Sequence, residues 1–124
     1  AEYLKDRYQL PTLVCGGPEE VQLLEQKLEG FSFIHSVAGR TSLNQLGVLA
    51  KKASVFIGNE SGPLHFATLA KTPLVALFGP GVEGVFYPYH QTSKIIHPLG
   101  LPTEKRMEAI TFDNVKIQVD QLMV

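Results

Sequence analysis

The sequence of 124 residues lacks several features that would mark it as a particular class of protein. It contains a single cysteine, Cys15, which excludes an internal disulfide, and it balances 11 Lys and Arg against 12 Asp and Glu. Proteins that bind nucleic acid need a basic surface, so we expect no nucleic-acid partner. No apolar run approaches the roughly 20 residues that a membrane-spanning helix requires. Cys15 lies in an apolar run, which predicts a buried structural thiol.

Motifs of metal sites and of common nucleotide enzymes are also missing. No His, Cys and carboxylate residues have the spacing of a zinc site, and no Asp-rich calcium loop is present, so we predict no metal site. The sequence has no Walker A pattern, no G-x-G-x-x-G and no G-x-S-x-G. Kinase, dinucleotide-dependent dehydrogenase and hydrolase functions therefore have no motif to support them.

Apolar runs of strand length alternate with helical patterns along the whole chain. This alternation predicts an α/β fold, a Rossmann-like parallel sheet with flanking helices. The length and the 44% hydrophobic content fit a single domain, residues 1–124. The chain has no initiator Met and begins with a helical pattern, so we expect a fragment of a longer protein. Strands are predicted at residues 12–17, 31–37, 54–58, 73–79 and 94–97.

Helices are predicted between these strands. One begins at Pro18, has its apolar stripe at Val21, Leu24 and Leu28, and ends at Gly30. A second begins at Ser42, with Leu43 on its buried face. A third helix runs from about Pro63, and Asp113 is expected to cap the last one. Residues 98–111 show no clear period, and we predict no element there.

The turn Gly-Asn-Glu-Ser-Gly-Pro-Leu-His, residues 58–65, follows the third strand. In a doubly wound sheet, ligands bind beyond the carboxyl ends of the strands. The free amides of a helix N-terminus attract anions, so Ser61, Gly62 and His65 are candidate diphosphate ligands. Glu60 would repel a phosphate but could accept hydrogen bonds from sugar hydroxyls. The alternative is that Ser61 is a simple helix cap and the charged side chains are solvated.

Two other strand-end loops carry candidate nucleotide ligands. In Gly-Gly-Pro-Glu-Glu, residues 16–20, an acid could accept hydrogen bonds from ribose hydroxyls or could simply interact with the helix dipole. In Gly-Arg-Thr-Ser, residues 39–42, backbone groups could bind a nucleobase and the arginine a phosphate. The plain alternatives are a solvated arginine and a serine cap. The candidate nucleotide-binding residues are Gly17, Glu19, Glu20, Arg40, Thr41 and Ser42.

Residues 39–80 together resemble a known family. Their pattern is similar to the C-terminal, nucleotide-sugar-binding domain of glycosyltransferase family 9, the bacterial heptosyltransferases of the lipopolysaccharide inner core. The similarity begins at about Leu13 and becomes diffuse after Pro80. The matching positions are Gly39, Ser42, Leu43, Glu60, Ser61, Gly62, Pro63, His65 and residues 72–80.

The resemblance implies a fold, a reaction and a location. It implies the C-terminal half of a GT-B glycosyltransferase, which transfers heptose from ADP-heptose with inversion and without a cofactor or catalytic metal. The acceptor would be a lipid-linked saccharide of the lipopolysaccharide core. The implied location is the cytoplasm, at the inner face of the bacterial inner membrane, with peripheral membrane association of the full-length protein.

The resemblance also implies roles for individual residues. Ser61, Gly62 and His65 would bind the diphosphate, and Glu60 would bind the sugar hydroxyls. Thr41 and its neighbours would bind adenine through backbone groups, and Glu19 or Glu20 would bind the ribose. The family usually has Asp where this sequence has Glu60, which leaves the identity of the sugar open.

The catalytic base of the family lies in the acceptor domain, which these residues do not include. We therefore expect no catalytic residue in this chain and no sugar transfer by the chain alone. Two alternative functions stay open. One is the UDP-sugar-binding half of a GT-B-like nucleotide-sugar epimerase, and the other is a non-catalytic nucleotide-binding module.

Overall fold

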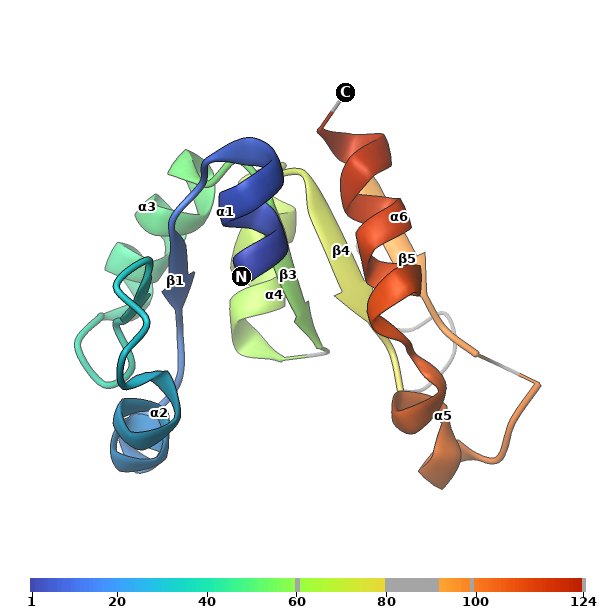
Figure 1. The fold of residues 1–124 in the computed structure, drawn as a ribbon, viewed down its shortest axis with the longest axis horizontal. Coiled ribbons are helices and arrows are strands. Elements are labelled where there is room, and N and C mark those ends of the chain that lie inside the picture. The colour runs from blue at the N-terminus through green and yellow to red at the C-terminus, as the bar shows by residue number, and fades with distance from the viewer. Residues whose placement is uncertain (60, 80–91, 99, 124) are drawn as a thin grey trace. The chain divides into compact units, whose positions relative to one another are not determined.

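The computed structural model describes residues 1–59, 61–79, 92–98 and 100–123. The chain divides into two compact units, Ala1–Leu43 and Asn44–Val124, each with parallel strands and helices (Figure 1). Among the described residues, no helix is long and apolar enough to cross a membrane.

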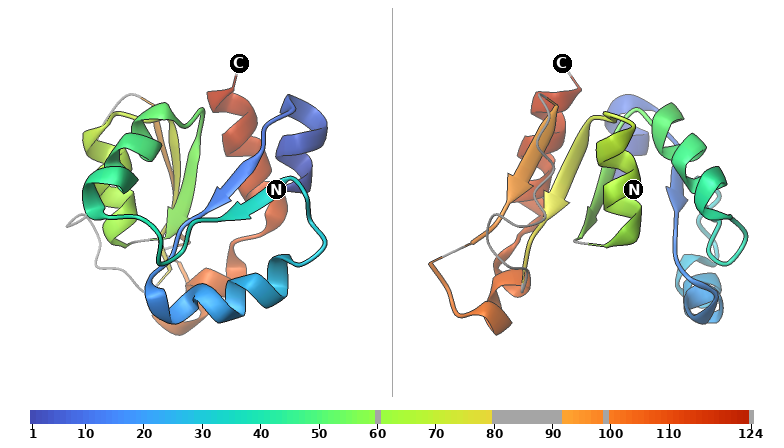
Figure 2. Two further views of the ribbon diagram at one scale, coloured as in Figure 1. Left: turned by 90° about the vertical axis from the view of Figure 1, so that its left-hand side faces the viewer. Right: turned by 180° about the vertical axis from the view of Figure 1, so that it is seen from behind.

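The first unit contains a two-stranded parallel sheet. Strands β1 and β2 pair with Thr12 opposite Ile34 and Val14 opposite Ser36, and both are visible in the left view of Figure 2. Helix α2 packs on β2. The elements of this unit are α1 (Glu2–Tyr8), β1 (Thr12–Val14), the 3-10 turn η1 (Pro18–Glu20), α2 (Val21–Leu28) and β2 (Ile34–Ser36).

The predicted start and end of the helix that begins at Pro18 are confirmed. Pro18 opens η1, which continues directly into α2, because proline fixes a helical φ and has no N–H to leave unpaired. The segment ends before Gly30, whose φ of 86° is in the left-handed region that favours glycine. Leu24 and Leu28 on the predicted apolar stripe are half-buried.

The second unit contains a three-stranded parallel sheet in the order β3-β4-β5. At its last register position, Asn59 lies opposite Leu77, which lies opposite Ile96. Figure 2 shows α4 and α6 on opposite faces of these strands. The elements from the junction onward are α3 (Leu43–Lys52), β3 (Phe56–Asn59), α4 (Gly62–Leu69), β4 (Leu74–Leu77), β5 (Ser93–Ile96), α5 (Thr103–Ala109) and α6 (Phe112–Leu122).

The core of the second unit lies between this sheet and α4. Leu74 and Ala76 of β4 are fully buried and cluster with Leu64 and Ala67 of α4 and with Ala50 of α3. Burial on both faces explains why β4 is apolar at every position rather than alternating. The predicted parallel α/β architecture is thus confirmed.

Two local predictions were wrong, the cap of α6 and the burial of Leu43. Thr111, not Asp113, caps α6: its Oγ1 accepts from the Asn114 N–H at 3.1 Å, and its own N–H donates to Asn114 Oδ1 at 3.1 Å. Asp113 lies instead in the first turn, where a negative charge favours the helix dipole. Leu43, predicted to be buried, is 68% exposed, because it is the first residue of α3 and burial begins at Leu46.

Residues 98–111, for which no element was predicted, contain α5. The seven residues of this helix, Thr-Glu-Lys-Arg-Met-Glu-Ala, are mostly strong helix formers. An amphipathic period cannot be recognised over two turns, so the helix is visible in residue propensity but not in the hydrophobic pattern.

Candidate functional site

The turn between β3 and α4 ends in a helix N-terminus that its N-cap residue, Ser61, does not cap with its side chain. Strand β3 ends at Asn59 and α4 begins at Gly62, with Ser61 as the extended N-cap residue. The Ser61 hydroxyl makes no capping hydrogen bond and instead donates to the Asn59 carbonyl at 3.3 Å. The first amides of α4 therefore receive no hydrogen-bond acceptor from Ser61, which leaves them suited to an anion.

Gly62 keeps the space in front of this helix end open. A Cβ on Gly62 would find no atom of the described residues within 4 Å, and the backbone there is not in the left-handed region. Neither local strain nor packing against the described residues therefore requires glycine. Pro63 follows at a position that favours a helix start, and His65 is exposed in the first turn. The geometry of the turn fits the approach of a bulky anionic group.

Glu60, the predicted sugar ligand, lies outside the described residues. Its role stays a prediction. The neighbouring residues Asn59, Ser61 and Gly62 are described, and together they place the carboxyl end of β3 directly before α4.

In the first unit, the structure brings the loops after β1 and β2 together. The Gly39 N–H donates to the Gly16 carbonyl at 3.1 Å. Gly39 has a φ of 67°, and a Cβ there would lie 2.8 Å from Val21 Cγ2 and 3.3 Å from Pro18 Cα. Both the backbone conformation and the close approach to η1 require glycine. The two predicted nucleotide-binding loops therefore meet at the carboxyl end of this sheet.

The two acids of the first loop differ in their partners. Glu20 Oε2 accepts a hydrogen bond of 2.8 Å from the Gly17 N–H, which gives its carboxylate a structural role in the turn. The exposed carboxylate of Glu19 also folds over Gly17, where a Cβ would lie 2.7 Å from Glu19 Cδ. A ribose contact by either acid stays a prediction, and Glu20 would have to share its carboxylate with the turn.

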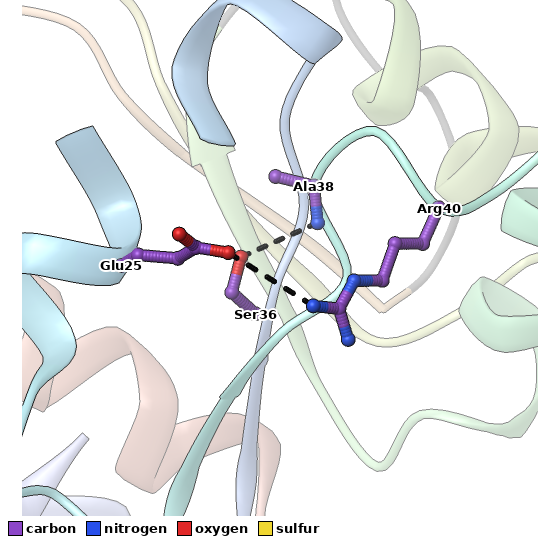
Figure 3. A network of polar contacts seen from close by, with 4 residues as sticks. All are labelled: Glu25, Ser36, Ala38 and Arg40. Carbon is purple, nitrogen blue, oxygen red and sulfur yellow. Dashed lines mark hydrogen bonds and ion pairs between the residues drawn. The ribbon is translucent and has the colours of Figure 1, made fainter. Parts of the chain in front are cut away.

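Arg40 in the second loop forms an exposed ion pair (Figure 3). Its Nη2 lies 3.9 Å from Glu25 Oε1, and the two side chains are 72% and 59% exposed. Beside this pair, the Ala38 N–H donates to Ser36 Oγ at 3.3 Å and shapes the start of the loop. An exposed pair at this distance contributes about 0–1 kcal/mol, so Arg40 can readily exchange it for an anionic ligand.

The remaining candidates in the second loop are Thr41, which is half-buried, and Ser42, which is exposed. Ser42 immediately precedes the first residue of α3, the position expected for its predicted role as a helix start. A nucleobase-binding role for either residue stays a prediction.

Cys15 has no reactive character in this setting. The thiol is half-buried, and desolvation by burial raises its pKa. A raised pKa keeps the sulfur in the protonated form, which is a poor nucleophile and a poor metal ligand. The described part of the chain also contains no group of three or more His, Cys, Asp or Glu residues that could hold a metal ion.

One contact beyond the carboxyl end of β4, in the second unit, was not predicted from the sequence. Gly79, just beyond β4, packs against Met107 of α5, so that a Cβ on Gly79 would lie 2.9 Å from Met107 Cβ. The only signal in the sequence was a glycine directly after a fully apolar strand, and α5 itself was not predicted.

Comparison with known proteins identifies relatives among the heptosyltransferases. Residues 2–118 match glycosyltransferase family 9 (heptosyltransferase). The lipopolysaccharide heptosyltransferase 3 of Escherichia coli strain K12 is 34% identical over 87 residues, which make up 68% of this chain and 25% of that protein. The chain thus spans about a quarter of the length of this curated relative.

Two solved structures share the fold. The E. coli ADP-heptose lipopolysaccharide heptosyltransferase II matches with a TM-score of 0.79 at 23% identity, covering 91% of this chain and 36% of that chain. The E. coli heptosyltransferase WaaC with ADP-2-deoxy-2-fluoro heptose matches with a TM-score of 0.74 at 19% identity, covering 97% and 35%. These likenesses confirm the predicted fold class. Because the family match extends over residues 2–118, the chain belongs to glycosyltransferase family 9.

Proposed function

We propose that this chain is the donor-binding part of an inverting glycosyltransferase that transfers heptose, or a related sugar, from an ADP-sugar to a lipopolysaccharide-core acceptor. The observation that carries the proposal is the start of α4. Its N-terminus is left without a side-chain cap by Ser61, and Gly62 leaves open space in front of it. A helix end of this kind favours a phosphate group, in particular a diphosphate.

The names of the relatives support the choice of ligand. One related structure is named as an ADP-heptose heptosyltransferase, and another contains ADP-2-deoxy-2-fluoro heptose. In this chain, Ser61, Gly62 and His65 would bind the diphosphate and Glu60 the sugar hydroxyls. Gly17, Glu19, Glu20, Arg40, Thr41 and Ser42 would bind the nucleoside.

Catalysis is assigned to a part of the enzyme outside these residues. Inverting transfer needs a general base that removes the proton from the attacking acceptor hydroxyl. The described strand-end loops offer ligands for a donor, and none of their side chains is placed in that role. We propose that the donor binds without a metal or cofactor, and that the enzyme meets its lipid-linked acceptor at the inner face of the inner membrane.

Isothermal titration calorimetry of the full-length protein tests this function. ADP, ADP-heptose, UDP and UDP-sugars are titrated separately, each with and without EDTA. We expect ADP and ADP-heptose to bind, with UDP and UDP-sugars at least about tenfold weaker, a difference of about 1.4 kcal/mol. A preference for uridine would overturn the proposal in favour of an epimerase-like UDP-sugar site.

A transfer assay separates the enzyme from a non-catalytic binding module. Full-length protein, ADP-heptose and a lipopolysaccharide-core acceptor are combined, and ADP release is followed over time. We expect transfer by the full-length protein and none by residues 1–124 alone. Tight ADP-heptose binding without any transfer by the full-length protein would indicate a binding module.

A further inference from the structure

Gly79 makes a close contact that links the end of β4 to helix α5. The residue is buried, and a Cβ built on it would lie 2.9 Å from Met107 Cβ, 3.0 Å from Met107 Cε and 3.3 Å from Met107 Cα. The outer side-chain atoms of Met107 could rotate away, but its Cβ and Cα are held by the backbone of the helix. A side chain at residue 79 would therefore force the backbone at Met107 or at residue 79 to shift.

This contact lies at the same end of the sheet as the start of α4 (Figure 1). Asn59 of β3 lies opposite Leu77 of β4, the last pair of the register. Ser61 comes two residues after Asn59, and Gly79 comes two residues after Leu77. Neighbouring strands are about 4.8 Å apart. Figure 1 shows α5 at the end of the sheet toward which the strand arrows point, which is also the end at which α4 begins.

We propose that Gly79 is a positioning residue for donor binding: its missing side chain lets α5 sit against the end of β4, where the helix borders the diphosphate end of the donor site. This inference rests on the proposed function. It adds α5 to the elements that shape the donor site, although α5 contains none of the predicted ligand residues.

The contribution of α5 is steric rather than electrostatic. Its two cationic residues, Lys105 and Arg106, are balanced by Glu104 and Glu108, so the helix carries no net charge toward a diphosphate. Arg106 Nε donates to the Leu101 carbonyl at 3.0 Å, which anchors the helix to the segment that leads into it. With α5 held in this way, the side chain of Met107 limits the space beside the end of β4.

The test compares two alanine substitutions in the full-length protein. Gly79→Ala introduces the clash with Met107, whereas Gly100→Ala is a matched control, because a Cβ there finds no atom of the described residues within 4 Å. We expect Gly79→Ala to raise the Kd for ADP by about tenfold or more and the Kd for adenosine, which lacks phosphates, by much less. Gly100→Ala should leave both constants unchanged.

A rescue experiment separates positioning from a general loss of stability. Met107→Gly in the Gly79→Ala background removes the nearest atom, Met107 Cβ, and should restore most of the affinity for ADP. A purely structural role would lower the melting temperature of Gly79→Ala but leave the ADP-to-adenosine Kd ratio at the wild-type value. That result would overturn the inference.

A second variant keeps the inference testable if Gly79→Ala does not fold. Met107→Ala introduces no clash and removes the thioether that packs over Gly79. We expect it to weaken ADP binding by about threefold with adenosine binding unchanged, and unchanged ADP affinity would contradict the inference. If wild-type protein does not bind ADP at all, the proposed function fails; if wild type binds and the Gly79 and Met107 variants bind equally well, only the role of α5 fails.

Discussion

The hydroxyl of Thr72 donates a hydrogen bond of 2.6 Å to the carbonyl of Ala50 in the last turn of α3. Both residues are buried, and among the described residues Thr72 is the one polar residue in the buried class. The bond joins the segment before β4 to the end of α3, whose last carbonyls have no partner within the helix. A side chain distant in sequence thus completes this helix end.

Thr72→Val keeps the shape of the side chain but removes this donor. We expect the free energy of unfolding to fall by about 1–2 kcal/mol, because a buried carbonyl loses its strongest partner. Thr68→Val is the matched control: its hydroxyl bonds to the Leu64 carbonyl within the same helix at 2.8 Å, and its loss should change stability by less than about 0.5 kcal/mol. Urea denaturation measures both, and equal effects would show that the Ala50 bond is not special.

Alanine substitutions at two glycines of the first unit distinguish the stability cost of backbone strain from that of steric contact. Gly30 and Gly39 both have positive φ, but a Cβ on Gly30 meets nothing within 4 Å, whereas one on Gly39 meets Val21 and Pro18. Gly30→Ala should cost about 1–2 kcal/mol from the left-handed conformation alone. Gly39→Ala should cost about 1–3 kcal/mol more from overpacking against η1. Thermal unfolding compares the two, and similar losses would contradict the close approach of the two loops.

Gly62→Val tests the open space at the start of α4. The side chain would enter the region in which we place the diphosphate, and its Cβ would meet no atom of the described residues within 4 Å. We expect the Kd for ADP to rise by about tenfold or more with little change in melting temperature. His65→Ala should weaken ADP binding in the same direction by removing a donor in the first turn. Unchanged affinity in both variants would indicate a plain structural turn.

Substitutions in the Arg40 and Glu25 ion pair should act on nucleotide binding with opposite signs. Glu25→Gln frees the guanidinium for an anionic ligand, so we expect slightly tighter ADP binding, by about twofold. Arg40→Gln should weaken ADP binding. Because the pair is largely exposed, neither change should alter the free energy of unfolding by more than about 1 kcal/mol. Weaker binding in both variants would mean that the pair acts only by shaping the loop.

The raised pKa of Cys15 predicts slow alkylation and a loss of stability at alkaline pH. The thiol of the folded protein ionises at higher pH than that of the unfolded chain, so iodoacetamide should label the native protein more slowly than the urea-unfolded protein at pH 8. As the pH rises above the thiol pKa of the unfolded chain, the unfolded state loses its proton first and the native state loses relative stability. Cys15→Ser is the control, since it removes this part of the pH dependence. Equal labelling rates in both states would contradict the burial.

The sequence by itself predicted the features that depend on short-range interactions. Alternating apolar runs and helical patterns gave the parallel α/β class, and Pro18 and Gly30 marked the ends of a helical segment. The turn containing Ser61 and Gly62 was recognised as a helix start, and its role as an anion site stays a prediction. These signals work because capping, backbone conformation and period are set by a few neighbouring residues.

Only the tertiary structure decided which partner each side chain takes. Ser61 bonds back to Asn59 instead of capping α4, Thr111 displaces Asp113 as the cap of α6, and Gly79 contacts Met107 of a helix that the pattern did not reveal. Ser61 and Thr111 each take a partner two or three residues away, one of several local alternatives of similar energy that the sequence pattern does not distinguish. Gly79 and Met107, in contrast, are brought together by packing between segments distant in sequence. For that reason residues 58–65 could be proposed as a donor site from the sequence alone, whereas the contact between Gly79 and α5 could be found only in the folded chain.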